Sequence, residues 1–204
     1  MAYHPDLHHR RSIRLKGFDY AHDGVYFVTV CSRDRECLFG QVIDGAVNLT
    51  EVGQVIGLAL MSLPAYFPHV DVPDYVVMPN HLHAIIKIAR DDVGAKQGVS
   101  ASPVLVDIGN LGKADEAFAL PLRGTVPGSL AAVVQNFKSV TTRKVNALRG
   151  TSGIPVWQRN YYERVIRNET ELAAIREYIA SNPGSWDQDR NHPENITSAQ
   201  GQSR

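Results

Sequence analysis

The chain has 204 residues, of which 44% are hydrophobic, and it carries 21 basic and 21 acidic side chains. This length and composition indicate one folded domain with a full hydrophobic core. No apolar run approaches the length of a membrane span, and no signal-peptide core is found near the start, so we expect a cytoplasmic protein. Two cysteines, Cys31 and Cys37, exclude a disulfide framework and are expected to be reduced.

Positive charge gathers in one part of the chain although the net charge is zero. Residues 129–167 contain a single acidic residue, Glu163, and seven basic ones: Lys138, Arg143, Lys144, Arg149, Arg159, Arg164 and Arg167. The N-terminal arm, residues 1–17, adds Arg10, Arg11, Arg14 and Lys16. Such a block indicates an anionic partner, with nucleic acid as the first candidate. A solvated helix face is the alternative explanation.

The first half of the chain predicts strands around one helix. Residues 25–31 are β-branched and aromatic, which is typical of a strand, and Asp44-Gly45 predicts a hairpin turn before a short strand at 46–49. Thr50 is expected to cap a helix that Pro64 ends. The run 69–88 predicts two central strands joined at Pro79-Asn80.

The second half predicts two helices. Residues 91–128 are rich in glycine and proline and are expected to form a flexible insertion. Ser129 is expected to begin a helix that ends before Gly150, and the segment 156–167 mixes aromatic residues with arginines. Asn168 should cap the last helix, which Pro183 ends. We expect one domain over residues 18–186 and a polar tail, 187–204, with the chain fraying from Gly184 onward.

Two histidines share one face of the strand that follows Pro79-Asn80. Residues alternate there, so His81 and His83 lie on one face while the apolar residues Leu82, Ala84, Ile86 and Ile88 form the core face. Neutral imidazole is the commonest protein ligand for a metal ion, and two imidazoles at this spacing can share one ion. Surface or packing roles for both histidines remain open on spacing alone.

A third ligand and a nucleophile are suggested by the last helix. Tyr178 and Asn182 lie one turn apart on one flank of its apolar stripe. An amide oxygen suits a Mg²⁺ or Mn²⁺ ion that also binds two imidazoles, and a phenol one turn away would face the same ion. Phenols are weak nucleophiles unless they are activated, for example when a metal polarises a phosphodiester. Tyr161 and Tyr162 compete for this role, and simple packing is the alternative.

Several segments together resemble the REP-associated tyrosine transposases, which are single-tyrosine members of the HUH nuclease superfamily. The matching segments cover most of residues 10–90 and 129–186. They are residues 18–40, Met78-Pro79-Asn80-His81-Leu82-His83, Trp157-Gln158-Arg159-Asn160-Tyr161-Tyr162-Glu163 and Tyr178-Ile179-Ala180-Ser181-Asn182-Pro183. The insertion and the tail lie outside the match.

The resemblance implies an α+β fold, a ferredoxin-like antiparallel sheet with helices on one side. It also implies that His81, His83 and Asn182 bind a divalent metal ion, Mg²⁺ or Mn²⁺, and that Tyr178 attacks single-stranded DNA beside a hairpin. The products would be a 5′-phosphotyrosine link and a free 3′-hydroxyl. The expected DNA-binding residues are Arg14, Lys138, Arg143, Lys144, Trp157, Arg159, Arg164 and Arg167. We expect a nucleoid-associated monomer or homodimer.

Two other functions compete with this hypothesis. A domesticated relative would bind DNA hairpins without cutting them, although the intact set of His81, His83, Tyr178 and Asn182 argues for catalysis. A metal-free phosphoesterase with two histidine motifs would need a second His-x-Thr or His-x-Ser element, which the sequence lacks.

Overall fold

The structure is a computed structural model, and it describes residues 23–89 and 125–196. The predicted arm with Arg14, nearly all of the predicted insertion and the end of the predicted tail lie outside the described residues, so these predictions stay untested. Within the described part, no helix combines the length and apolarity that a membrane crossing requires.

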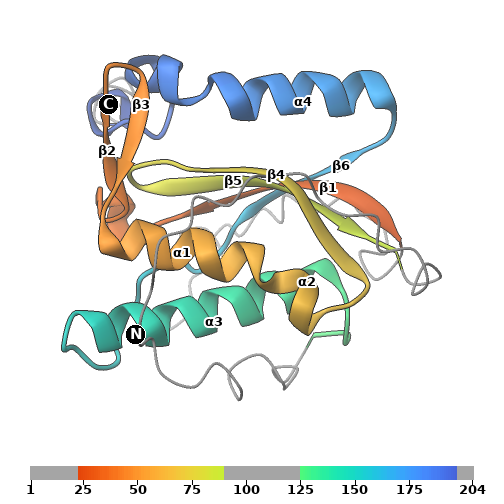
Figure 1. Cartoon of the computed structure of the whole chain (residues 1–204), viewed down its shortest axis with the longest axis horizontal. Helices are drawn as coiled ribbons and strands as arrows, with labels where there is room; N and C mark the ends of the chain where they lie inside the picture. Colours follow the sequence, from red (N-terminus) through yellow and green to blue (C-terminus); the bar gives the residue numbers. More distant parts are fainter. Residues whose placement is uncertain (1–22, 90–124, 197–204) are drawn as a thin grey trace, which may run out of the picture.

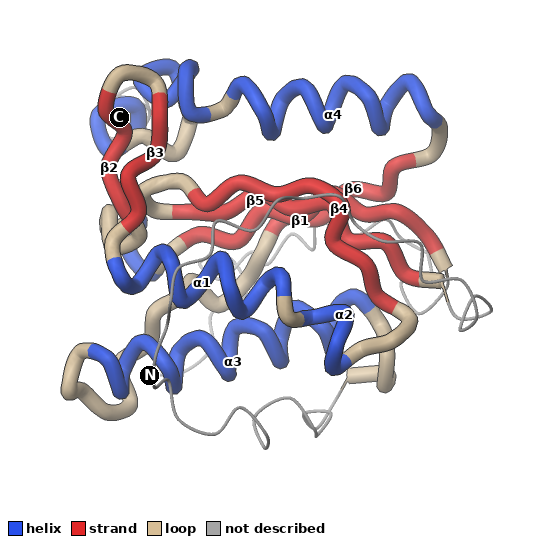
Figure 2. The backbone as a smooth tube through the Cα atoms, viewed as in Figure 1, coloured by secondary structure: helices blue, strands red, loops and turns tan. Residues whose placement is uncertain are grey.

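One antiparallel sheet forms the middle layer of the fold (Figures 1 and 2). Its strand order is β4 (Val70–Val77), β5 (His81–Ile88), β1 (Gly24–Cys31) and β6 (Tyr162–Ile166). Helical segments connect β1 to β4 and β5 to β6, so the connectivity is ferredoxin-like. The predicted α+β class is therefore confirmed. In this order β5 is an interior strand, and it carries the histidine pair.

The prediction of two central strands holds for β5 and is wrong for β4. Strand β4 lies at the edge of the sheet, and its pairing with β5 is irregular between Asp71 and Asp74. Pro73 lies in this irregular stretch and has no N–H to donate to a neighbouring strand. Proline is tolerated at a sheet edge for that reason, so the sequence carried a signal for the edge position.

Three helices cover one face of the sheet: α1 (Glu51–Met61), α2 (Leu63–Tyr66) and α3 (Leu130–Leu148). The predicted caps are confirmed, since Thr50 Oγ1 accepts from the N–H of Gly53 and Ser129 Oγ from that of Ala132. The apolar face of β5 packs here, together with alternate residues of β1, against the buried stripes of α1 and α3. This layer is the main hydrophobic core.

A fourth helix covers the opposite face, so the expectation of helices on one side only is wrong. Helix α4 (Glu169–Ser181) lies across the other side of the sheet from α1 and α3 (Figure 1). Its buried residues Ile175 and Ile179 pack on Phe27, Ile85 and Ile166, which form a second, smaller core. The histidine pair shares this face of the sheet, so α4 covers the site instead of leaving it open.

The chain after α4 folds back over one end of the sheet. Residues Pro183–Gln188 form a 3-10 helix, η2, beside the hairpin of β2 (Gly40–Ile43) and β3 (Ala46–Leu49). Trp186, Asp189 and Asn191 are buried. The expectation that the chain frays from Gly184 is therefore wrong for the described residues up to 196. Trp186 packs on the ring of His81 and anchors this segment.

Helix α1 approaches the backbone of Phe39 closely enough that only glycine fits at position 53. A Cβ atom on Gly53 would lie 2.0 Å from the carbonyl oxygen of Phe39, whereas one on Gly57 would have Val77 Cγ2 at 3.9 Å as its nearest neighbour. We predict that Gly53→Ala lowers the free energy of unfolding by about 2 kcal/mol or more, because the helix must shift. The matched control Gly57→Ala should be neutral or stabilising by up to about 1 kcal/mol. Urea unfolding of both variants measures the difference, and equal stabilities would contradict the contact.

Candidate metal centre and DNA-binding groove

The two imidazoles of β5 face each other in a site closed to solvent. His81 and His83 are both 0% exposed, and their Nε2 atoms lie 3.0 Å apart. The position of each ring is fixed from behind at Nδ1: Asn80 Oδ1 lies 2.9 Å from His81 Nδ1, and Thr29 Oγ1 lies 2.8 Å from His83 Nδ1. Alternation along the strand and cover by α4 therefore bring both Nε2 atoms to one point.

Both imidazoles are neutral at physiological pH. Burial lowers the pKa of His81 to about 4, although the Asp189 carboxylate acts in the opposite direction. Burial and the neighbouring His81 ring lower the pKa of His83 well below its usual value. Neutral imidazole is the form that binds a metal ion, so neither ring must lose a proton first.

Tyr178 points from α4 at the histidine pair. Its hydroxyl lies 3.2 Å from His83 Nε2, and its ring packs edge-on against Phe27. The side chain is 41% exposed, so the hydroxyl lies between the buried imidazoles and solvent. Burial, followed by the Asp189 carboxylate, raises the pKa of Tyr178. The phenol is therefore protonated at neutral pH unless positive charge is added beside it.

The other two tyrosines that compete for the nucleophile role have different surroundings. Tyr161 lines a groove on the α3 side of the sheet. The ring of Tyr162 packs edge-on against Phe27, with the Arg190 guanidinium 5.6 Å from its centroid. Among these three tyrosines, Tyr178 is therefore the one whose hydroxyl contacts an imidazole of the pair.

Asn182 is held by its amide nitrogen, which donates to Asp189 beside the histidine pair. Asp189 Oδ2 accepts a hydrogen bond from Asn182 Nδ2 at 3.2 Å, and a carboxylate can only accept, so this contact assigns the nitrogen of the amide. The oxygen, Asn182 Oδ1, is buried and has no hydrogen-bond partner among the described residues. A buried oxygen without a donor is well suited to bind a cation.

Asp189 is the acidic residue of the site, and the sequence analysis missed it. Its Oδ2 lies 3.7 Å from His81 Nε2, and its Oδ1 accepts from the backbone N–H of Asn191 at 2.6 Å. In the sequence, only Trp186, an aromatic residue in an otherwise polar segment, hinted that this part of the chain is folded. In the structure Trp186 is buried, and its indole stacks on the His81 ring at 6.0 Å between centroids. Asp189 follows three residues later.

The donor set fits a divalent cation. His81, His83 and Asp189 are all buried and each offers one ligand atom, and these atoms lie within 4.8 Å of one another. Two nitrogens that each lie about 2.1 Å from one ion, with an angle of about 90° between the two bonds, are about 3.0 Å apart. The two Nε2 atoms have this separation. The group of His81, His83 and Asp189 could therefore bind a metal ion.

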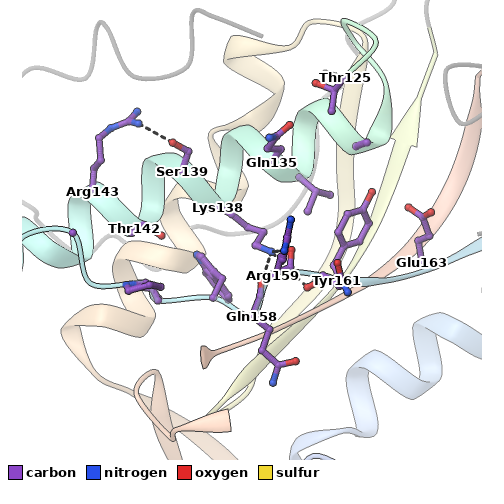
Figure 3. A pocket seen from close by; sticks show the side chains of 17 residues that line it. Thr125, Gln135, Lys138, Ser139, Thr142, Arg143, Gln158, Arg159, Tyr161 and Glu163 are labelled. Atoms are coloured by element: carbon purple, nitrogen blue, oxygen red, sulfur yellow. Dashed lines mark hydrogen bonds between the residues drawn. The ribbon is translucent and has the colours of Figure 1, made fainter. Parts of the chain in front are cut away.

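A groove runs along the opposite side of the sheet, between α3 and residues 153–163 (Figure 3). Its volume is about 940 Å³. The polar and charged side chains that line it include Gln135, Lys138, Ser139, Thr142, Arg143, Gln158, Arg159, Asn160 and Glu163. The residues that line it do not include the histidine pair. His81, His83 and Asp189, which could bind a metal and are called the metal-binding group, are thus separate from the groove, on the other face of the sheet.

Two of the predicted DNA-binding residues have structural roles in the groove wall. The ammonium of Lys138 donates to the carbonyl oxygens of Gln158 and Arg159, and burial lowers its pKa to about 8 (Figure 3). Trp157 is only 6% exposed, and its indole N–H donates to Thr141 Oγ1 at 2.8 Å. Stacking on bases needs an exposed ring face, and this ring has little, so the DNA-binding role of Trp157 stays a prediction.

The remaining predicted DNA-binding residues divide between two surfaces. Arg143 and Arg159 are exposed and line the groove. Lys144 is half-buried on α3. Arg164 forms an ion pair with Glu171 of α4, and Arg167 is exposed just beyond the end of β6. The basic block is therefore not one continuous surface, since strands and helices direct its members to different faces.

Two arginines near the centre were not singled out from the sequence. Arg35 donates to Asn191 Oδ1 at 2.7 Å, and Arg190 is exposed close to Tyr162. Both help to lower the pKa of His81. Their positive charge lies where a phosphate at the metal-binding group would need compensation.

Comparisons with other proteins find a relative in sequence and several likenesses in structure. No family model matches the chain. An uncharacterized protein of Haemophilus influenzae is 38% identical over 188 residues, which cover 92% of this chain and 96% of that protein.

A REP-associated tyrosine transposase bound to a REP hairpin superposes with a TM-score of 0.50 at 18% identity, over 84% of this chain and 74% of that chain. This likeness concerns the fold, and it confirms the α+β class and the four-stranded antiparallel sheet that the resemblance implied. A candidate transposase from Deinococcus radiodurans gives a TM-score of 0.40 at 14% identity, over 82% of this chain and 95% of that chain.

The buried neutral histidines make the metal-free protein sensitive to acid. In the unfolded chain His81 titrates near 6.5, and in the folded protein its pKa is about 4. The unfolded state therefore binds more protons between these values, and the free energy of unfolding falls as the pH decreases from 6.5 to about 4. We expect His81 to account for about 3 kcal/mol of this loss.

Urea unfolding at several pH values with a chelator present measures this loss. The double variant His81→Gln/His83→Gln should show a flatter dependence on pH than the wild type. An unchanged slope in the double variant would contradict the burial of neutral rings.

Proposed function

Since the chain belongs to the same family as the Haemophilus influenzae protein and shares the fold of a REP-associated tyrosine transposase, we propose that it is a metal-dependent DNA strand transferase. It would cut single-stranded DNA beside a hairpin and rejoin it. A single observation carries the proposal: the Tyr178 hydroxyl lies 3.2 Å from His83 Nε2, inside the group that could hold a metal.

His81, His83 and Asp189 would hold a divalent ion such as Mg²⁺ or Mn²⁺, with Asn182 Oδ1 as a further oxygen ligand. A bound ion would withdraw charge from the oxygens of a phosphodiester. Tyr178 would place its hydroxyl in line with the phosphorus. Arg190, exposed on the same side, would add positive charge near the phosphate.

In the proposed reaction the phenol oxygen of Tyr178 bonds to phosphorus and the bond from phosphorus to the 3′ oxygen breaks. The phenol proton leaves, and the 3′ oxygen takes up a proton to become a free hydroxyl. The product is a 5′-phosphotyrosine link. Because one phosphodiester is exchanged for another, a 3′-hydroxyl can reverse the step without an external energy source.

The groove would hold the DNA next to the cut. Strand β1 connects it to the metal-binding group, because Cys31 pairs with His81 while Ser32 forms a bridge with Trp157. The N–H of Gln158 also donates to the carbonyl of Cys31. The wall of the groove and the histidine pair thus lie at the same end of the sheet. A strand that leaves the groove there would have a short path to Tyr178.

A covalent adduct between protein and DNA tests the proposed reaction. Hairpin oligonucleotides with a single-stranded flank, incubated with the wild type and Mg²⁺ or Mn²⁺, should give an adduct that resists denaturation. Tyr178→Phe should give none, because it lacks the attacking oxygen, while the matched control Tyr162→Phe should still give the adduct. His81→Ala should lose metal-dependent cleavage and keep most of its hairpin binding. A wild type that forms no adduct with either ion and several hairpins would overturn the proposal.

The salt dependence of hairpin binding tests the groove. Arg143 and Arg159 are exposed there, so replacing either with alanine should weaken binding to all sequences and reduce the salt slope by about one unit. Arg176→Ala is the matched control, because this arginine lies on α4 and pairs with Asp74. Filter-binding titrations at several salt concentrations measure the slopes. Equal slopes for all three variants would mean that DNA does not enter the groove.

A hairpin-binding protein without cleavage is the second candidate function. The same groove would serve it, and binding would then persist in the presence of a chelator. The 3.2 Å contact between Tyr178 and His83 favours the enzyme, because binding alone gives no reason to bring a phenol to two buried imidazoles.

A further inference from the structure

The two imidazoles of the metal-binding group differ in what lies behind them. Asn80 donates through Nδ2 to two backbone carbonyl oxygens, those of Arg35 at 3.1 Å and Asn191 at 2.7 Å. Carbonyl oxygens only accept, so the amide nitrogen must be the atom that faces them. The amide oxygen of Asn80 is then the atom that contacts His81 Nδ1.

This contact fixes the tautomer of His81. An amide oxygen can only accept, so Nδ1 of His81 must carry the ring proton. In the neutral ring Nε2 is then a bare lone pair, which points at His83 Nε2 only 3.0 Å away. His81 is therefore held permanently in the form that binds a metal ion.

The tautomer of His83 is not fixed in this way. Its Nδ1 faces the hydroxyl of Thr29 at 2.8 Å, and a hydroxyl can donate or accept. Thr29 is buried on β1, directly opposite His83 in the sheet register. Without a cation, two lone pairs 3.0 Å apart would repel each other. The stable arrangement places the proton of His83 on Nε2, where it is donated to His81 Nε2, so the Tyr178 hydroxyl 3.2 Å from that nitrogen does not donate to it.

Binding of a cation requires the opposite tautomer. Both Nε2 atoms must then offer lone pairs, so His83 must carry its proton on Nδ1 and donate it backwards. One proton leaves Nε2 to solvent and one is taken up at Nδ1, so the total number of bound protons is unchanged. The hydroxyl of Thr29 stops donating and becomes the acceptor.

We infer that Thr29 is the positioning residue that allows His83 to exchange one tautomer for the other when the site takes a cation. The inference rests on the proposed function only in that the site binds a divalent ion. A purely structural role would be served by any buried hydrogen bond of fixed direction, such as the one Asn80 makes with His81. The reversible donor and acceptor character of the Thr29 hydroxyl is what the exchange needs.

Mn²⁺ affinity, measured by titration calorimetry without DNA, tests this role. Thr29→Val retains the shape of the side chain and can neither donate nor accept, so we expect affinity to fall by about 10–100-fold. Thr29→Ser retains the hydroxyl, so its Mn²⁺ affinity should stay within about threefold of that of the wild type. This change is smaller than the one expected when a metal ligand loses its outer hydrogen bond. Thr29→Val that binds Mn²⁺ as tightly as the wild type would overturn the inference.

Nitrogen-15 NMR of the histidine rings gives a second readout that does not depend on how the valine variant folds. In wild type without a cation the proton of His83 should be found on Nε2, and on addition of Mg²⁺ it should move to Nδ1. His81 should be protonated on Nδ1 in both states. A proton on Nδ1 of His83 before Mg²⁺ is added would overturn the role of Thr29 and leave the proposed function intact. A wild type that binds neither ion would overturn the proposed function itself.

Discussion

The centre of this protein depends on two neutral imidazole nitrogens held 3.0 Å apart away from water. Burial keeps both rings uncharged, and the contact of Asn80 with His81 leaves a lone pair directed at the neighbouring ring. Such an arrangement has little value to a folded core, where two apolar side chains would pack without any polar cost. It is well suited to a positive ion that both nitrogens share.

The rest of the fold can be understood as support for this arrangement. An interior strand fixes the spacing of the rings, and the helix on one face of the sheet brings a phenol and an amide to them. The segment after that helix adds the carboxylate of Asp189, which orients the amide of Asn182. The helices of the other face form the main core, and with residues 153–163 they leave a polar groove. The histidine group and the groove therefore lie on opposite faces of one sheet.

Much of this could be predicted from the sequence because it follows local rules. Alternation along residues 81–88 placed both histidines on one face, and helical spacing placed Tyr178 beside Asn182. Capping residues such as Thr50 and Ser129 gave the starts of helices correctly. The resemblance then supplied the connectivity of the sheet, which no local pattern determines.

Other features could not be predicted, because they depend on contacts between distant parts of the chain. The carboxylate of Asp189 meets the histidines only because Trp186 packs on the His81 ring, and a polar tail gives little sign of such packing. Trp157 looked available for stacking because aromatic and basic residues surround it in sequence, yet the core between β1 and α3 encloses it. Charge and aromaticity indicate a surface only when the neighbouring elements are known.

The segment after α4 also sets the order in which the centre is assembled. A ribosome makes the histidine strand early, whereas Asn182, Asp189 and Asn191 emerge after all four strands of the sheet. A nascent chain therefore carries the imidazoles for some time without the carboxylate and amides that surround them in the finished protein. The centre is completed only when the polypeptide has folded back across its own first strands, so a prematurely terminated product has the sheet but not the full set of polar groups.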